Sequence, residues 1–132
     1  MRMMVVVAGL LLAACSSTGP SEARLGEEFE LSPNQSVSVA GTGLTIGFRR
    51  VVGDSRCPID AVCVTEGSAG VELEVFGTSE SSPVILYTPL PRAWTDGVYQ
   101  LDVLELRPQP TVGRVITPDE YRVRLVVNLA QQ

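Results

Sequence analysis

YRVRLVVNL, at residues 121–129, alternates apolar and polar side chains more clearly than any other stretch of the chain. Its apolar residues occupy nearly every second position from Tyr121 to Leu129. Successive side chains of a β-strand point to opposite faces of the sheet, whereas an amphipathic helix repeats about every 3.6 residues. The stretch therefore predicts a β-strand that turns one face to an apolar core and the other to water.

Similar patterns recur upstream, separated by turns rich in Gly and Pro. Five segments alternate and a sixth is a short apolar run; in chain order they are residues 29–31, 36–39, 44–48, 71–75, 84–87 and 99–106. In the last of these the alternation changes phase after Val103, as the extra residue of a β-bulge would cause. About seven strands predict an all-β fold, an antiparallel β-sandwich of immunoglobulin-like type, with a small barrel as the alternative.

A short turn is expected directly before the C-terminal strand, at residues 117–120. Thr117 is a typical N-cap, and Pro118 suits the first position of a helical turn. Tyr121 follows and has two interpretations. Its hydroxyl hydrogen-bonds back across the corner, as in the tyrosine corner of sandwich folds, or the residue is simply an aromatic member of the core. The second interpretation is favoured.

The first fifteen residues are organised like the leader of an exported protein. Arg2 precedes an apolar run at residues 3–12, and Leu-Ala-Ala-Cys closes the segment at residues 12–15. The apolar run is too short to cross roughly 30 Å of hydrocarbon as a helix, which argues against a transmembrane segment. An ordinary signal peptide followed by a chance cysteine is the other alternative.

The closing tetrapeptide at residues 12–15 resembles the lipobox of bacterial lipoprotein signal peptides. The resemblance implies that residues 1–14 are removed and that Cys15 carries diacylglycerol and fatty acids such as palmitate, which anchor the protein to a membrane of the cell envelope. Residues 15–26 are expected to form a flexible tether, and residues 27–132 the β-sandwich domain. Ser16 differs from the Asp that retains such lipoproteins in the inner membrane, so a cell with two membranes is expected to carry the protein in the outer one.

The charge of the chain argues against two kinds of partner. Fifteen acidic residues oppose ten basic ones, all of them arginine, which gives a net charge of −5. No basic cluster is present to neutralise phosphates, so we predict no binding to nucleic acid. For the same reason the folded domain is not expected to adhere to anionic lipid. The expected contacts are the membrane, through the N-terminal lipid, and a protein of the cell envelope.

Two cysteines remain once Cys15 is lipidated, namely Cys57 and Cys63. An even pair in an oxidising compartment predicts a disulfide, and one that closes so short a loop mainly fixes the shape of that loop. A zinc site would need about four ligands, and the chain has no histidine. A redox-active pair usually has two intervening residues, whereas five separate these cysteines. A structural disulfide is therefore favoured.

The sequence around this pair carries a second resemblance. Asp-Ser-Arg-Cys-Pro at residues 54–58, followed by Cys63, resembles a widespread group of small bacterial secreted and lipid-anchored β-domain proteins without an established activity. The resemblance extends over residues 101–110 and 118–127, and so over most of the mature domain. Thr65 departs from the pattern, because the group often has an aromatic residue, such as Trp, at that position. What the resemblance implies is a fold and no specific chemistry.

The residues that most enzymes use for catalysis are either absent from the chain or explained by a structural role. Without histidine, the Ser/His/Asp and Cys/His arrangements and the usual general base cannot be assembled. Glu72 and Glu74 follow the polar face of a predicted strand, which explains them without a carboxylate pair for hydrolysis. Asp54, Asp60 and Glu66 offer a weak calcium site as one interpretation. A solvated acidic loop in which Arg56 pairs internally is favoured, so we predict a protein without enzymatic activity, metal or other cofactor.

Two surfaces are candidates for binding. The first is the predicted disulfide loop, residues 54–66, with Asp54, Arg56 and Asp60 as candidate contacts. The second is a proline-rich connection at residues 88–97, with Arg92 and Trp94 as candidates. An exposed Trp beside an Arg has the composition of an interface anchor. Because large aromatic side chains are mostly buried, the favoured interpretation is that Trp94 folds back onto the sandwich.

Two functions of different class follow from this sequence. The first is a non-catalytic interaction module of the cell envelope that binds another macromolecule through its loops. The second is an inhibitor or immunity-type protector, whose rigid disulfide loop occupies the cleft of an envelope hydrolase. The first is favoured.

Overall fold

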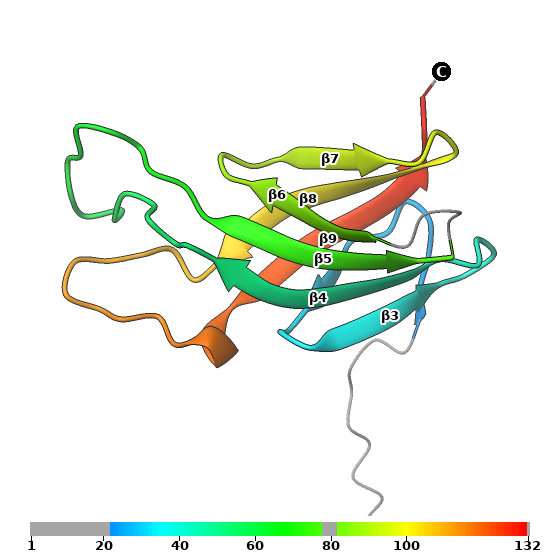
Figure 1. The fold of residues 1–132 in the computed structure, drawn as a ribbon, viewed down its shortest axis with the longest axis horizontal. Helices are drawn as coiled ribbons and strands as arrows, with labels where there is room; N and C mark the ends of the chain where they lie inside the picture. The colour runs from blue at the N-terminus through cyan, green and yellow to red at the C-terminus, as the bar shows by residue number, and fades with distance from the viewer. Residues whose placement is uncertain (1–21, 78–81, 132) are drawn as a thin grey trace, which may run out of the picture.

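The computed structural model describes residues 22–77 and 82–131, which form two β-sheets packed face to face (Figure 1). The expected leader, the lipidation site Cys15 and most of the expected tether therefore lie outside the described residues. The chain forms the strands β1 (Glu22–Ala23), β2 (Phe29–Leu31), β3 (Gln35–Val39), β4 (Thr45–Val52), β5 (Gly70–Phe76), β6 (Ser82–Tyr87), β7 (Arg92–Thr95), β8 (Tyr99–Arg107) and β9 (Arg122–Leu129), with one 3-10 turn, η1 (Pro118–Glu120).

One sheet has five strands in the order β1-β3-β4-β5-β6, and the other has four in the order β2-β9-β8-β7. Every pair of neighbours is antiparallel except β1 and β3, which run parallel. Each sheet keeps two edge strands, so the predicted sandwich is confirmed and the alternative of a small barrel is not adopted. In immunoglobulin constant domains strands A, B, E and D form one sheet and C, F and G the other. Here consecutive strands stay neighbours, in the order β3 to β6 and then β7 to β9.

All seven strands expected from the sequence are present, and two more flank them. β1 lies inside the expected tether: Ala23 is 5% exposed, and its carbonyl accepts a hydrogen bond from the Ala40 amide at 2.8 Å. Residues 22–23, which the sequence places in the tether, therefore pair with β3 in the five-stranded sheet. β7 lies inside the expected proline-rich loop, where Arg-Ala-Trp-Thr pairs with β8. Neither segment alternates over enough residues to be recognised as a strand.

The inner faces of the two sheets form one apolar core, and no polar side chain of the described residues is buried in it. In β9 the side chains of Val123, Leu125 and Val127 are fully buried, whereas Arg124 faces solvent. Each such burial stabilises the fold by roughly 1.5–3 kcal/mol. The expected bulge is also present, because the register between β8 and β9 shifts between Val103 and Glu105.

The outer face of the five-stranded sheet carries ion pairs. Arg50 Nε lies 2.6 Å from Glu72 Oε2, and Arg49 pairs with Glu74 at 2.8 Å. This confirms that the two glutamates stand on the polar face of their strand. Within the described parts of the chain, no helix has the length and apolar character needed to cross a bilayer.

Three connections meet at one end of the sandwich. They are residues 53–69 between β4 and β5, residues 88–91 between β6 and β7, and residues 108–121 between β8 and β9. The first and third extend beyond the sheets at the same end, as the green and orange loops of Figure 1. We call this the three-loop end. The short turns β3–β4 and β7–β8 lie at the opposite end.

Candidate interaction site at the three-loop end

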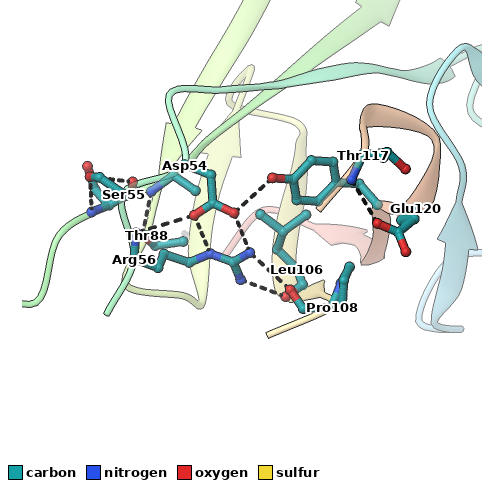
Figure 2. A network of polar contacts seen from close by, with 11 residues as sticks. Asp54, Ser55, Arg56, Thr88, Leu106, Pro108, Thr117 and Glu120 are labelled. Carbon is teal, nitrogen blue, oxygen red and sulfur yellow. Dashed lines mark hydrogen bonds and ion pairs between the residues drawn. The ribbon is translucent and has the colours of Figure 1, made fainter. Parts of the chain in front are cut away.

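Arg56 is the residue that joins the loops of this end (Figure 2). Its Nε and Nη2 donate to the two carboxylate oxygens of Asp54, at 2.8 and 2.7 Å. Its Nη1 donates to the carbonyl of Leu106 at 3.1 Å, and Nη2 also donates to the carbonyl of Pro108 at 3.0 Å. Four of the five guanidinium N–H groups are thus engaged. The side chain thereby links the 53–69 loop to the end of β8 and to the first residue of the 108–121 loop.

Asp54 completes this network as an ionised carboxylate. Burial raises its pKa, but hydrogen bonds from Arg56 and Tyr121 and the charge of Arg56 outweigh burial, so the pKa lies below its usual value of 3.8. The side chains of Arg56 and Asp54 are only 10% and 13% exposed. The internal pairing favoured from the sequence is present. A carboxylate held in this way is not available as a general acid at neutral pH.

Tyr121 joins the network from the start of β9. It is buried in the core, and its hydroxyl donates to Asp54 Oδ2 at 2.9 Å. Burial, the hydrogen bond to Asp54 and the charge of that carboxylate raise the pKa of Tyr121 to about 12. The residue is thus a core aromatic, as favoured, and it also bonds across the corner. Its acceptor is a side chain 67 positions away, not the nearby backbone that a tyrosine corner uses.

The turn before Tyr121 has the expected form. Thr117 is the N-cap of η1 and Pro118 its first residue. The Thr117 amide donates to Glu120 Oε2 at 2.7 Å, and the Thr117 hydroxyl donates to the Asp119 carboxylate at 2.6 Å. These bonds fix the end of the 108–121 loop and, through it, the position of the Tyr121 ring.

The expected disulfide is present and closes the apex of the 53–69 loop. Cys57 and Cys63 are bonded, with their Cα atoms 6.0 Å apart. Below the apex, the Cys57 amide donates to the Glu66 carbonyl at 2.8 Å and the Ser55 amide to the Ser68 carbonyl at 2.7 Å. The loop is therefore braced across its base as well as across its apex.

Two hydrogen bonds join the apex to the neighbouring loop. The Ile59 amide donates to the Pro110 carbonyl at 3.0 Å, and Asp60 Oδ1 accepts a bond from the Val112 amide at 2.9 Å. Three of the four groups in these two bonds belong to the backbone, so the bonds hold the two loops together as one unit. Asp60, a candidate contact from the sequence, braces this unit.

Several large apolar side chains are exposed on this unit. Of the exposed large apolar side chains in the described residues, the five most exposed all lie on these two loops. Val62 and Val64 beside the disulfide are 103% and 106% exposed relative to an extended reference. We call the set the apolar tip; it consists of Ile59, Val62, Val64, Val112 and Val115. Single exposed apolar residues are normal on protein surfaces, whereas five of them on two loops joined by hydrogen bonds form a candidate interaction surface.

A hollow of about 380 Å³ adjoins the base of the disulfide loop. Residues from all three loops line it over the bulged part of β8, among them Pro58, Glu66, Leu90, Leu104, Leu106 and Gln109. Its only cationic group is the Arg56 guanidinium, which is already neutralised by Asp54. The hollow has room for a side chain of a partner and holds no unpaired positive charge for an anion.

The second candidate surface has a structural role. Trp94 lies on the edge strand β7 opposite Leu101 and packs, partly buried, against the core. Arg92 is exposed, and its Nε donates to the Pro89 carbonyl at 3.2 Å. The interpretation that Trp94 folds back onto the sandwich agrees with this packing, although the residue does so from a strand and not from a loop.

The calcium interpretation finds no support in the geometry. Asp54 is bonded to Arg56, Asp60 to the Val112 amide, and Glu66 contributes its backbone carbonyl to the loop. In residues 22–77 and 82–131, no three His, Cys, Asp or Glu side chains lie close enough together to hold a metal ion.

The apolar tip is the feature that sequence reasoning missed. Val62 and Val64 flank a cysteine in a segment with no period of two, and Val112 and Val115 lie between two strands. Apolar residues outside any strand pattern are the signal that would have revealed them. Comparisons with protein-family models, with curated proteins and with solved structures give no match to this chain.

Proposed function

We propose that this protein is a lipid-anchored lipoprotein of the cell envelope, and that it is a non-catalytic module that binds another envelope protein through its three-loop end. The lipobox at residues 12–15 and the leader before it support the anchor. Ser16 supports the outer membrane as its location in a cell with two membranes. The absence of histidine from the whole chain and the pairing of Cys57 with Cys63 support a role without catalysis.

The observation that carries the binding role is the placement of the apolar tip. Val62 and Val64 are exposed in full, although the loop that bears them is held by a disulfide and by backbone hydrogen bonds. A pre-ordered loop loses little conformational entropy when a partner binds, so more of the free energy of burying the valines appears as affinity. The Arg56 network serves the same purpose, because it fixes the base of the loop.

An inhibitor of an envelope hydrolase is the second candidate function. The observation that favours it is the shape of the disulfide loop, which projects beyond the sheets (Figure 1). Its two fully exposed valines lie next to the disulfide in the chain. A rigid projecting loop of this kind fits a concave active site. Recovery of a hydrolase whose activity falls in the complex would select this function over a structural partnership.

Two experiments test the proposal. Cys15→Ser should abolish labelling by radioactive palmitate and move the protein from the membrane to the soluble fraction; unchanged labelling and partition would refute the anchor. The full-length lipidated protein, purified from gently solubilised envelopes after brief cross-linking, should bring down one partner in a constant ratio. If no protein is recovered with it in a constant ratio, whichever surface is cross-linked, the binding role is wrong.

A further inference from the structure

The chain enters the sandwich at the end remote from the three loops. Ala23 pairs with Val39, the last residue of β3, and the Gly26 amide donates to the Val127 carbonyl near the end of β9. β4 spans the sandwich from this end to the three-loop end over its eight residues, Thr45–Val52. At about 3.3 Å for each of the seven steps between these residues, this is roughly 23 Å. The 53–69 loop adds further distance to the apolar tip.

The segment between Cys15 and Glu22 limits how the domain can meet its own membrane. Seven residue steps separate the two positions, which at full extension reach at most about 25 Å. To insert the apolar tip end-on, the domain would have to turn over, so that the point of attachment lay at least the length of β4 above the lipid. The length of β4 alone nearly equals the full extension of the segment, and the 53–69 loop projects farther beyond the sheets. The segment is therefore too short for that arrangement.

We propose, on the basis of the function given above, that the apolar tip docks into an apolar recess of a protein that stands on the side away from the anchor membrane. The recess has a basic rim, because Asp60 and Glu66 are exposed residues of the same loop, each two positions from Val62 or Val64 in the chain. The basic residue of the 108–121 loop, Arg114, is already paired with Glu120 at 2.7 Å.

The charge of the tip also favours such a protein over two other possible occupants, an anionic lipid bilayer and a second copy of the chain. Anionic lipid headgroups would meet Asp60 and Glu66, and the chain as a whole carries a net charge of −5, so an anionic bilayer repels this end of the domain. A second copy of the chain would bring the same carboxylates together, which costs binding free energy. A recess with basic residues at its rim meets no such opposition.

Photo-cross-linking in living cells tests the proposal on the full-length chain. Benzoylphenylalanine is placed singly at position 64 or 115 of the tip, or at position 98 as the matched control. Val98 is also an exposed valine in a turn, at 59% exposure, but it lies at the opposite end, between β7 and β8. Adducts are identified by mass, and the cross-linked peptide of the partner is located in its sequence. The purified partner is then titrated with the Val64→Asp and Val98→Asp proteins.

We expect positions 64 and 115 to cross-link to the same partner polypeptide, and position 98 not to cross-link to it. The cross-linked peptides of the partner should form a single apolar recess with basic residues at its edge. Val64→Asp should weaken binding at least about tenfold, and Val98→Asp less than twofold. Lipid adducts at position 64, adducts of twice the mass of the chain, or equal losses for both variants would overturn the proposal. A partner that is recovered but cross-links only elsewhere would refute the tip as the site and leave the binding role standing.

Discussion

Replacement of Arg56 by methionine tests whether the network below the disulfide loop holds the three-loop end together. The change removes four hydrogen bonds: two to the Asp54 carboxylate and one each to the carbonyls of Leu106 and Pro108. It leaves a largely buried carboxylate with Tyr121 as its remaining side-chain donor. Loss of one partner from a buried ion pair costs roughly 3–5 kcal/mol, because the other charge remains desolvated.

Thermal and urea unfolding, followed by circular dichroism under oxidising conditions, measure the effect. For a domain of about this size, each kcal/mol lowers Tm by roughly 4–8 °C, so Arg56→Met should lower Tm by more than about 10 °C. The matched control is Arg50→Met, which breaks an equally short pair with Glu72 at a position where the arginine side chain is 69% exposed. That loss should stay below about 1 kcal/mol.

Equal losses for the two variants would refute the reasoning. They would show that the Arg56 pair behaves as an ordinary surface contact, and that the loop keeps its shape without it. A loss in Arg56→Met that is accompanied by an unchanged affinity for the partner would refute the claim that the network positions the apolar tip.

Three further outcomes follow from the same contacts. Asp54→Asn should destabilise the protein at pH 7, and the difference in free energy of unfolding between the variant and the natural protein should shrink as pH falls below about 4. The reason is that the folded-state pKa of Asp54 lies below 3.8, so its contribution to stability is present above the unfolded pKa and is lost as pH falls through the folded value. A difference that is constant down to pH 2 would contradict this. In absorbance titrations at 295 nm, Tyr121→Phe should remove a phenol step near pH 12; because this pKa is raised, the matching stability is present below pH 10 and lost as pH rises toward 12. If the titration step near pH 12 remains unchanged in Tyr121→Phe, the step belongs to another tyrosine. The fluorescence of Trp94 should be blue-shifted from that of the unfolded chain and partly protected from acrylamide, since the ring packs against the core; an emission maximum that does not move on unfolding would place it in water.

The sheets could be predicted because their signal is local. A strand with one wet face repeats every two residues, and in β9 this repeat places Val123, Leu125 and Val127 in the core. The bulge in β8 was visible for the same reason, since an extra residue changes the phase of the alternation. β7 has only four residues with one partly buried side chain, so it carries no period that could be recognised.

The site could be predicted only in part, because its contacts join distant positions. The disulfide and the pairing of Arg56 with Asp54 follow from neighbours in the chain. The bonds from Arg56 to Leu106 and from Tyr121 to Asp54 cross 50 and 67 positions, and nothing in either segment indicates the other. The apolar tip depends on such contacts too, because the bonds from Ile59 to Pro110 and from Val112 to Asp60 bring the two loops together.

Hydrogen–deuterium exchange on the lipidated protein, alone and with its captured partner, tests most directly whether the apolar tip is where this molecule binds. We expect slower exchange on binding at the amides of residues 57–66 and 109–115, with the turn at residues 96–98 unchanged. Slower exchange confined to that turn or to the outer face of β6, with the two loops unaffected, would contradict the account.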